Sequence, residues 1–369
     1  MQKMIKICHI LDTLNIGGLE KTLIKIISDL KGYEHQVWCL KNKGILAKEV
    51  EDKGVLLREF NFAGGITIPA LLRLSKALKR ENINIVHCHG LFPSIWGRVA
   101  AILAGVPVKI VHCQNVYYGI PKKDVIKLRL LSFFTAKIIA VSEAVKKCLI
   151  EFVGINPGKI TVIYNSAART AGQDVLTREG FRRSIGLDKN DFVSGSISRI
   201  EEHKGHSFFI EAVAKCKSDN VPCKCIIAGD GPYKEYLGAK IKKLGLEDRV
   251  ILLGWRKDIQ ALLLAMDVFV YSSILREGLP LALAEAASAG LPLIVTQIGG
   301  NSEIVENGVN GFVVPPGDAG ALAEKIKYFV ENPAETKKMG EFSRKIWEDK
   351  FALEEMIHKI DSLYKSLIS

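Results

Sequence analysis

Short apolar segments alternate with longer amphipathic segments along most of the chain, and this alternation constrains the fold more than any other feature. The apolar runs IKICHIL (5–11), HQVWCL (35–40) and INIVHCHG (83–90) are interspersed with helical segments such as EKTLIKIISDL and IWGRVAAILAG. Strands that are apolar throughout and are joined by helices form parallel sheets with helices on both faces. The sequence therefore predicts an α/β fold built from βαβ units.

The alternation lapses between residues 166 and 191, where the chain is polar and rich in Gly, Asp and Arg. A polar stretch between two alternating regions is typical of a domain boundary. We expect two Rossmann-like α/β domains, residues 1–170 and 171–345. Residues 346–369 are expected to form a C-terminal helix that packs back toward the N-terminal domain.

The composition excludes several classes of protein. A chain of 369 residues with 48% hydrophobic residues suits two globular domains. No apolar run is long enough for a transmembrane helix, and the first residues predict a strand instead of a secretory signal. The eight cysteines lack the paired spacing of a metal site, so reduced thiols are expected. These features predict a cytoplasmic protein.

The positive charge is concentrated in the first half of the chain. Residues 1–170 hold 25 Lys and Arg against 12 Asp and Glu, whereas residues 171–369 hold 26 against 28. Within residues 70–150 the numbers are 13 and 3. This bias predicts an anionic partner, which could be nucleic acid, an anionic membrane or a phosphorylated substrate.

The loop after the first strand, NIGGLE, carries Gly17 and Gly18 where a helix begins. Ligands of open α/β sheets bind at the carboxyl ends of strands. Glycines let the backbone approach a ligand, and a helix N-terminus offers N–H groups to an anion. An ordinary tight turn explains the two glycines equally well.

Two loops of the second domain also follow strands. Arg199 and Lys204 lie five residues apart and could place two cations on one diphosphate, although a solvated basic loop has the same pattern. Gly229 and Gly231 belong to a GDGP turn whose backbone amides are exposed, and most such turns have no ligand.

The segment REGLPLALAEAASAG (276–290) places two glutamates around a helix start. Pro280 suits the first turn of a helix, so Glu277 precedes the helix and Glu285 lies in its second turn. The helix is almost entirely small and apolar, so Glu285 needs a partner, either adjacent ligand hydroxyls or an Arg or backbone group. Gly278 and Leu279 would add amide donors for an anion.

Taken together and in this order, these motifs resemble the retaining glycosyltransferases of family 4, which have the two-domain GT-B fold. The resemblance covers nearly the whole chain. Its most specific parts are ISRIEEHKGHSFFIEAVA and VYSSILREGLPLALAEAASAGLPLIVTQIGGNSEIVENGVNGFVVPPGD. The resemblance implies two Rossmann-like domains with a deep cleft between them.

The resemblance also implies a role for each motif. The C-terminal domain would bind a nucleotide sugar, a UDP- or GDP-sugar, and the N-terminal domain would bind the acceptor. Arg199 and Lys204 would hold the diphosphate, Glu285 the ribose and Glu277 the donor sugar. Further donor contacts are implied for Gly17, Gly18, Gly229, Gly231, Arg256 beside Trp255, Gly278 and Leu279, and Gly299, Gly300 and Glu303 would shape the same cleft.

His89, in the strand-end sequence His87-Cys88-His89, corresponds to a histidine that family members often carry near the sugar. A pair of strand-end histidines with no ligand is an equally good interpretation. A metal at this pair is disfavoured because no third ligand is apparent. Since the chain also has no Asp-x-Asp motif, we expect no metal and no cofactor besides the nucleotide-sugar co-substrate.

Two departures from the family pattern concern the acceptor side. Gln114-Asn115 stands where many relatives have His-Asn or His-Gly, and residues 165–168 read Asn-Ser-Ala-Ala instead of Asn-Gly-Val-Asp. The resemblance implies transfer with retention by same-face attack, in which the leaving phosphate helps to deprotonate the acceptor hydroxyl. No nucleophile from the protein is then needed.

Residues 121–137, PKKDVIKLRLLSFFTAK, combine five basic residues with apolar ones. A helix of this composition could lie on an anionic bilayer, which suits a lipid-linked sugar or a lipopolysaccharide core as the acceptor. A core-facing helix with solvated lysines is the alternative. We expect a cytoplasmic enzyme of polysaccharide or glycolipid synthesis that associates peripherally with the inner face of the cytoplasmic membrane.

Three other functions are compatible with parts of the sequence. A GT-B protein that binds sugar nucleotides without activity is the first. A nucleic-acid-binding protein would suit the isoelectric point near 9.1, but no helix-turn-helix, RNA-binding or zinc motif supports it. A glycosidase could use Glu277 and Glu285 as its carboxylate pair, but the phosphate-type loops argue against it.

Overall fold

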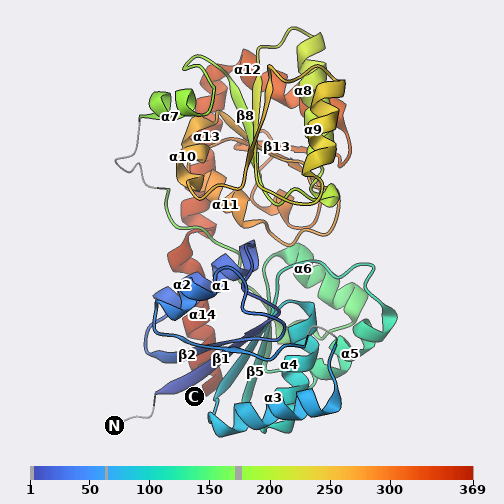
Figure 1. Cartoon of the computed structure of the whole chain (residues 1–369), viewed down its shortest axis with the longest axis vertical. Helices are drawn as coiled ribbons and strands as arrows, with labels where there is room; N and C mark the ends of the chain where they lie inside the picture. Colours follow the sequence, from blue (N-terminus) through green and yellow to red (C-terminus); the bar gives the residue numbers. More distant parts are fainter. Residues whose placement is uncertain (1–3, 63–64, 171–176, 369) are drawn as a thin grey trace. The chain divides into compact units, whose positions relative to one another are not determined.

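The computed structural model describes residues 4–62, 65–170 and 177–368, and the chain forms two units (Figure 1). The N-terminal unit comprises Met1–Asn165 together with Glu354–Ser369, and the C-terminal unit comprises Ser166–Leu353. The junction that we expected after residue 170 borders residues 171–176, which lie outside the described residues. The domain boundaries of the sequence analysis therefore stay predictions.

The N-terminal unit is built on a seven-stranded sheet in the order β3-β2-β1-β4-β5-β6-β7. Every neighbouring pair is parallel. The strands are β1 (Ile5–Leu11), β2 (Tyr33–Cys39), β3 (Leu56–Glu59), β4 (Ile85–His89), β5 (Val108–Cys113), β6 (Lys137–Ala140) and β7 (Ile160–Val162). The helices are α1 (Gly18–Asp29), α2 (Ala47–Glu51), α3 (Ile68–Arg80), α4 (Leu91–Leu103), α5 (Lys122–Ser132), α6 (Glu143–Cys148) and α14 (Leu353–Ile368).

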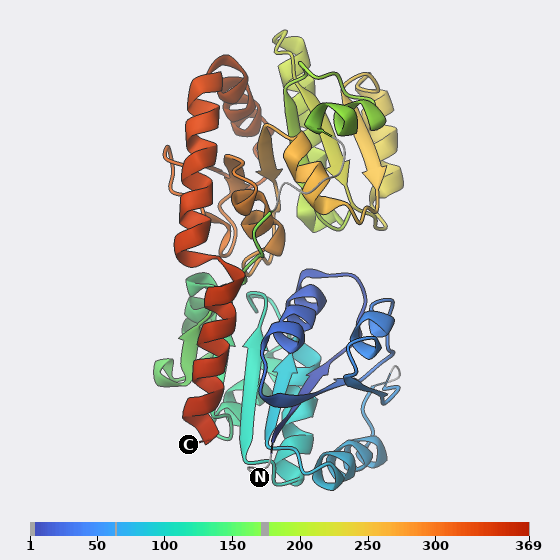
Figure 2. The same cartoon turned by 90° about the vertical axis from the view of Figure 1, so that its left-hand side faces the viewer.

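Helix α14, the red helix near the C-terminus in Figure 2, packs on the sheet of the N-terminal unit. The hydroxyl of Tyr364 lies 2.6 Å from Nδ1 of His87 in β4. Tyr33 in β2 donates its hydroxyl to Asp361 at 2.8 Å. The last helix of the chain therefore completes the core of the first sheet.

The C-terminal unit is built on a six-stranded sheet in the order β10-β9-β8-β11-β12-β13, again with parallel pairs. Its strands are β8 (Val193–Ile197), β9 (Lys224–Ala228), β10 (Val250–Gly254), β11 (Val268–Tyr271), β12 (Leu293–Thr296) and β13 (Gly311–Val314). Its helices are α7 (Arg178–Ser184), α8 (His206–Ser218), α9 (Lys234–Lys243), α10 (Ile259–Ala265), α11 (Leu281–Ser288), α12 (Ala319–Glu331) and α13 (Pro333–Lys350). The predicted α/β class with two Rossmann-like sheets is confirmed.

Two segments differ from the sequence-based expectation. The polar stretch after residue 166 contains a short helix, α7, whose N-cap Thr177 accepts a hydrogen bond from the Gly180 amide at 3.2 Å. The helix expected within residues 121–137 ends at Ser132, and Lys137 already belongs to β6. Phe133 and Phe134 therefore lie in the turn after α5.

Candidate active site

The predicted donor motifs of the C-terminal unit lie in loops that follow neighbouring strands. Arg199 and Lys204 follow β8, Gly229 follows β9, Glu277 follows β11 and Gly299 follows β12. Because the strands are parallel, their carboxyl ends meet at one edge of the sheet, and the strand order reverses between β8 and β11. This is the place where open α/β sheets bind ligands.

Lys204 and Glu277 form a buried ion pair at this edge. Nζ of Lys204 lies 2.8 Å from Oε1 of Glu277 and 2.9 Å from the hydroxyl of Tyr271. The Tyr271 hydroxyl in turn donates to the same Glu277 oxygen at 3.4 Å. Glu277 is only 4% exposed. The three side chains therefore hold one another at the end of β11.

The surroundings of Lys204 keep its side chain charged. Burial by itself disfavours the ammonium, but the neighbouring Tyr271 and Glu277 outweigh burial and raise the pKa of Lys204 above its ordinary value. Burial raises the pKa of Tyr271, so the phenol is protonated at neutral pH. The site thus presents a fixed cation, oriented by a carboxylate and a phenol.

The backbone beside Glu277 is held by its neighbours. Arg276 has a φ of +57°, which is a costly conformation for a residue other than glycine. Gly299 has a φ of +53°, and a Cβ there would lie 1.8 Å from the carbonyl oxygen of Glu277. The amide of Gly300 donates to the carbonyl of Gly278 at 2.7 Å. The loop after β12 therefore clamps the Glu277 loop in place.

The glycine turn after β9 is clamped in the same manner. Gly229 has a φ of +149°, and a Cβ there would lie 1.8 Å from the carbonyl oxygen of Ser198. Ile200 donates its amide to the carbonyl of Asp230 at 2.9 Å. Gly231 belongs to the same turn. The GDGP turn thus supports the loop that carries Arg199 and Lys204.

Arg199 is placed differently from Lys204 although both belong to one loop. Its side chain is 62% exposed, and its Nη1 lies 2.9 Å from Oε1 of Glu201. Among the described residues, no hydrogen bond or ion pair joins Arg199 to Lys204 or Glu277. Arg199 is therefore able to change partner without disturbing the buried pair.

Helix α11 begins at Leu281 directly after Pro280, as the sequence predicted. Gly278 and Leu279 are buried in the loop before it, and Glu285 lies half-buried in its second turn. Arg256 lies in the loop after β10, at the same edge of the sheet, and its Nε donates to Oδ1 of Asp258 at 2.8 Å. Trp255 beside it is 46% exposed.

The remaining predicted residues belong to the N-terminal unit. Gly17 is the N-cap of α1, and Gly18 is its first residue. His89 is 2% exposed at the end of β4, and its Nε2 lies 3.1 Å from Nδ1 of His9. His87 and His89 are thus part of a larger group of buried histidines, which is treated below.

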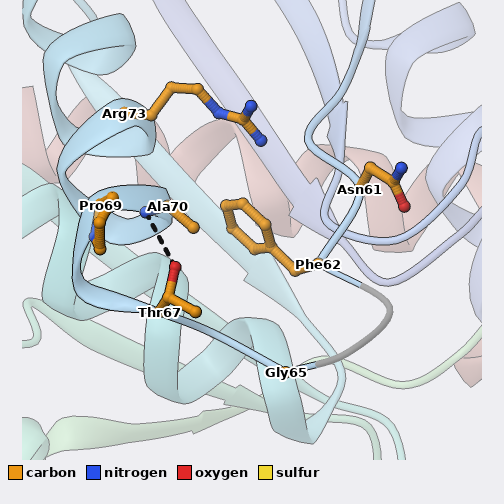
Figure 3. Close-up of a pocket in the computed structure, with 7 residues that line it drawn as sticks. All are labelled: Asn61, Phe62, Gly65, Thr67, Pro69, Ala70 and Arg73. Atoms are coloured by element: carbon orange, nitrogen blue, oxygen red, sulfur yellow. Dashed lines mark hydrogen bonds between the residues drawn. The ribbon is translucent and has the colours of Figure 1, made fainter.

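A surface pocket of about 460 Å³ lies in the N-terminal unit between the end of β3 and the start of α3 (Figure 3). Thr67 caps α3 there by accepting the Ala70 amide at 3.3 Å. Its lining consists of Asn61, Phe62, Gly65, Thr67, Pro69, Ala70 and Arg73. None of the predicted site residues contributes to this pocket.

The two halves of the chain match two different family descriptions. Residues 16–167 match the family described as Glycosyltransferase Family 4, and residues 177–346 match the family described as Glycosyl transferases group 1. A curated Escherichia coli protein, UDP-Gal:alpha-D-GlcNAc-diphosphoundecaprenol alpha-1,3-galactosyltransferase, is 36% identical over 259 residues, which is 68% of this chain and 67% of that protein. This chain belongs to the family 4 glycosyltransferases. The predicted family is confirmed.

Solved structures place this glycosyltransferase in the GT-B fold. Anabaena Alr3699/HepE in complex with UDP superposes with a TM-score of 0.87 at 25% identity, over 98% of this chain and 100% of that chain. A glycosyltransferase from Rickettsia africae ESF-5 gives a TM-score of 0.88 at 25% identity, over 100% and 99% of the two chains. The predicted GT-B fold and the class of nucleotide-sugar-dependent glycosyltransferase are confirmed. Across residues 4–62, 65–170 and 177–368, no helix has the length and apolarity needed to cross a membrane.

Proposed function

We propose that this glycosyltransferase transfers a sugar from a UDP-sugar, with retention, to a hydroxyl of a glycan or lipid-linked acceptor in polysaccharide or glycolipid synthesis. The observation that carries the proposal is the buried ion pair of Lys204 and Glu277 at the carboxyl edge of the second sheet. UDP is favoured over GDP because the Anabaena structure contains UDP and the Escherichia coli relative is named for a UDP-sugar.

Lys204 and Arg199 neutralise the charge that develops on the diphosphate as the glycosidic bond to the donor breaks. Lys204 is already fixed by Glu277 and Tyr271, so it needs little rearrangement in the transition state. Arg199 is exposed and exchanges its contact with Glu201 for a phosphate oxygen. These two cations supply the counter-charge that a divalent metal supplies in other transferases, so the proposed reaction uses no catalytic metal.

Glu277 binds a hydroxyl of the donor sugar and does not attack its anomeric carbon. One of its oxygens already accepts hydrogen bonds from Lys204 and Tyr271, which makes that carboxylate a poor nucleophile. Retention then follows from attack by the acceptor on the face from which the diphosphate leaves, with the phosphate taking the acceptor proton. Glu285 binds the ribose hydroxyls, and the amides of Gly278 and Leu279 contact the diphosphate.

Further donor contacts are also proposed. Gly17 and Gly18 offer amides at the start of α1, and Gly229 and Gly231 shape the turn beside Arg199. His89 is left out of the proposed donor site, because it is buried and its Nε2 already lies 3.1 Å from Nδ1 of His9. Arg256 contributes least to donor binding, because its guanidinium is already held by Asp258.

The N-terminal unit carries a surface that suits peripheral contact with the inner face of the cytoplasmic membrane. Ile126 and Leu130 on α5, and Phe133 and Phe134 after it, are each between 57% and 73% exposed. The exposed basic residues Lys122, Lys123 and Arg129 lie on the same helix. Apolar side chains flanked by lysine and arginine bind anionic bilayers. Such contact would bring the enzyme to a lipid-linked acceptor.

The proposal is tested by measuring UDP or GDP release from a panel of UDP- and GDP-hexoses in the presence of a diphosphoundecaprenol-linked sugar. We expect turnover with at least one UDP-hexose and a product whose anomeric configuration, read by NMR, equals that of the donor. A product of opposite configuration would overturn retention. Absence of turnover with every UDP-hexose, but turnover with a GDP-hexose, would overturn the choice of base.

A further inference from the structure

Five of the eight histidines of the chain lie together in the core of the N-terminal unit. They come from four neighbouring strands, β1, β2, β4 and β5, and all are buried: His9, His35, His87, His89 and His112. In the parallel register His9 lies opposite His87, and His89 lies opposite His112. Residues paired in register share a face of the sheet, so the imidazoles lie in one layer. Five pairs among His9, His87, His89 and His112 have ring centroids 4.2–5.5 Å apart.

Three of these rings each place one nitrogen close to a nitrogen of the other two. The ligand nitrogens of His9, His87 and His89 all lie within 4.8 Å of one another. We expected no metal at His87 and His89 because the sequence showed only two ligands. His9 supplies the third from β1, more than seventy residues earlier in the chain.

A chain of hydrogen bonds fixes which nitrogen of His9 is free of a proton. Nε2 of His35 lies 2.9 Å from the carbonyl oxygen of Leu30, which only accepts, so this nitrogen carries the proton. Nδ1 of the neutral His35 ring is then an acceptor for Nε2–H of His9 at 3.1 Å. Nδ1 of His9 therefore accepts a hydrogen bond from Nε2 of His89 at 3.1 Å. A metal ion bound between the two nitrogens would take the place of this proton, and His89 would then carry its proton on Nδ1.

His87 also has one nitrogen bonded to a neighbour and one nitrogen without a proton donor or acceptor among the described residues. Its Nδ1 is bonded to the hydroxyl of Tyr364, while its Nε2 is buried and has no hydrogen-bond partner within the described part of the chain. Both nitrogens of His112 are likewise buried and without a partner among those residues. An unpaired buried nitrogen is explained by an ion or by an ordered water. An imidazole held by an outer partner on one nitrogen, with the other facing inward, is how histidines bind metals.

We propose that His9, His87 and His89 form a binding site for one transition-metal ion of the zinc type. Neutral imidazoles are good ligands for such ions. Nitrogens bound at about 2.0–2.1 Å in a tetrahedral site lie roughly 3.4 Å apart, so the His9 and His89 nitrogens are already close to that spacing. Binding an ion requires the His87 nitrogen, which lies within 4.8 Å of the other two, to move closer to them. The ion joins β1 to β4 and, through Tyr364, to α14, so it stabilises the N-terminal unit and takes no part in donor binding.

The test uses the full chain made without a polyhistidine tag. The protein is unfolded in denaturant with a chelator, refolded with one equivalent of ZnCl2, passed through gel filtration and analysed for zinc by mass spectrometry. We expect about one zinc per chain and a higher unfolding temperature than for protein refolded without zinc. His87→Gln should retain less than a tenth of that zinc. His358→Gln, an exposed histidine on α14, is the matched control and should retain all of it.

A second measurement does not depend on whether His87→Gln folds. Wild-type protein refolded with CoCl2 should show the intense visible absorption of tetrahedral cobalt, and ZnCl2 should abolish it. Wild-type protein that holds no zinc after refolding, and shows no cobalt absorption, would overturn the proposal. Zinc retained equally by wild type and by folded His87→Gln would overturn it as well. In either case an ordered water would explain the unpaired nitrogens.

Discussion

Arg199 and Lys204 are two cations of one loop, but they differ in burial, and burial decides what each substitution does. Lys204 is 14% exposed and shares Glu277 with Tyr271, so its removal leaves a buried carboxylate without its counter-charge. Such a change destabilises a protein by about 3–5 kcal/mol. Arg199 is exposed and pairs only with Glu201 among the described residues. Its role in the reaction can therefore be separated from stability.

Arg199→Ala is expected to lower kcat for UDP-sugar transfer by about 100-fold, as the loss of one charge-stabilising donor does. The free energy of unfolding should change by less than about 0.5 kcal/mol, because exposed ion pairs contribute little. Steady-state kinetics and urea unfolding measure the two effects. Arg183→Ala is the matched control, since Arg183 is 70% exposed and pairs with Glu179. Equal kcat values for the two variants would remove Arg199 from the site.

His206 makes the stability of the C-terminal unit depend on pH. It is buried at the start of α8 with Nε2 3.0 Å from Oγ of Ser198, and burial, followed by Lys204 and His203, lowers its pKa to about 4. The unfolded chain binds a proton at this histidine near pH 6.5, before the folded chain does. The contribution of His206 to stability is therefore intact above about pH 6.5 and is lost as the pH falls toward 4.

The free energy of unfolding in urea, measured at pH 7 and pH 4.5, tests this expectation. His206→Gln should lose less stability than wild type between the two pH values, because glutamine does not titrate. An identical loss in both proteins would show that His206 does not carry the effect.

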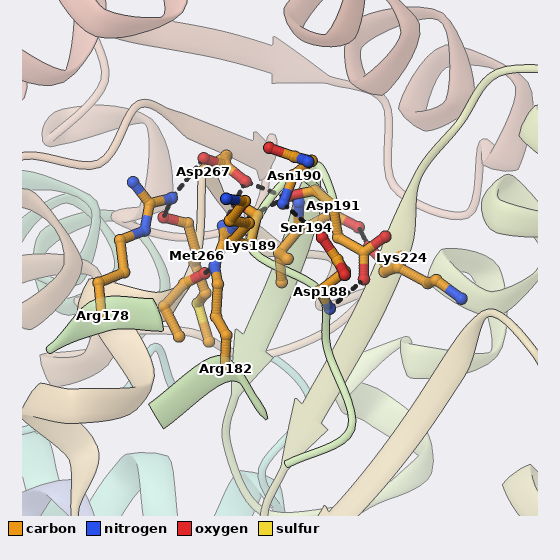
Figure 4. Close-up of polar contacts among 12 residues, drawn as sticks. Arg178, Arg182, Asp188, Lys189, Asn190, Asp191, Ser194, Lys224, Met266 and Asp267 are labelled. Atoms are coloured by element: carbon orange, nitrogen blue, oxygen red, sulfur yellow. Dashed lines mark hydrogen bonds and ion pairs between the residues drawn. The ribbon is translucent and has the colours of Figure 1, made fainter. Parts of the chain in front are cut away.

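At the scale of elements, an Arg–Asp cluster fixes α7 to the amino ends of β8 and β11 (Figure 4). Arg182 donates to Asp267 at 2.8 Å and to the carbonyls of Ala265, Lys189 and Asp191 at 2.9 Å. Asp267 also accepts the amide of Val193 at 2.7 Å. The cluster lies at the edge of the sheet opposite to the proposed donor site.

Arg182→Met should destabilise the protein by about 3 kcal/mol, because it leaves Asp267 and several carbonyls without their buried partner. Arg178→Met is the matched control: Arg178 bonds to the same aspartate at 2.5 Å but is 50% exposed, so its loss should cost less than about 1 kcal/mol. Urea unfolding compares them. Similar losses for both variants would refute the assignment of stability to the buried contact.

The exposed apolar residues at α5 lead to a prediction about binding to membranes. Serine at both Phe133 and Phe134 should lower binding to vesicles that contain phosphatidylglycerol by at least about tenfold, since each phenylalanine contributes about 1.5–3 kcal/mol when buried. Co-sedimentation measures the bound fraction. Ile68→Ser is the control because Ile68 is 75% exposed on α3 of the same unit. Binding that is insensitive to the double substitution would separate α5 from any membrane contact.

The sequence identified those candidate site segments that are continuous in the chain. The Arg199–Lys204 loop and the Glu277 segment are recognisable because their spacing is local. The contact between Lys204 and Glu277 joins residues 73 positions apart, and Tyr271 looked like an ordinary strand residue, so neither was foreseen. Helix α7 was missed because seven residues are too few to show a helical period. His9 was missed as a partner of His89 because the two residues are far apart in the sequence. Only the pairing of β1 with β4 in the folded sheet brings them together.

At the scale of the whole molecule, each unit is built on one parallel sheet and carries its own group of candidate functional residues. The C-terminal unit carries the donor motifs on loops after β8, β9, β11 and β12, and the N-terminal unit carries the buried histidines and the exposed apolar residues of α5. Both sheets reverse their strand order once, at β1–β4 and at β8–β11. We therefore propose that the nucleotide binds at one sheet edge of the C-terminal unit, with Lys204 at the centre of its site.

The thermal shift caused by UDP, in wild type and in Lys204→Met, tests this assignment most directly. A ligand that binds the folded state raises the unfolding temperature by mass action. We predict that UDP raises the unfolding temperature of the wild-type chain and leaves that of Lys204→Met unchanged, each compared with the same protein without UDP. An equal shift in both proteins would contradict the placement of the diphosphate at Lys204.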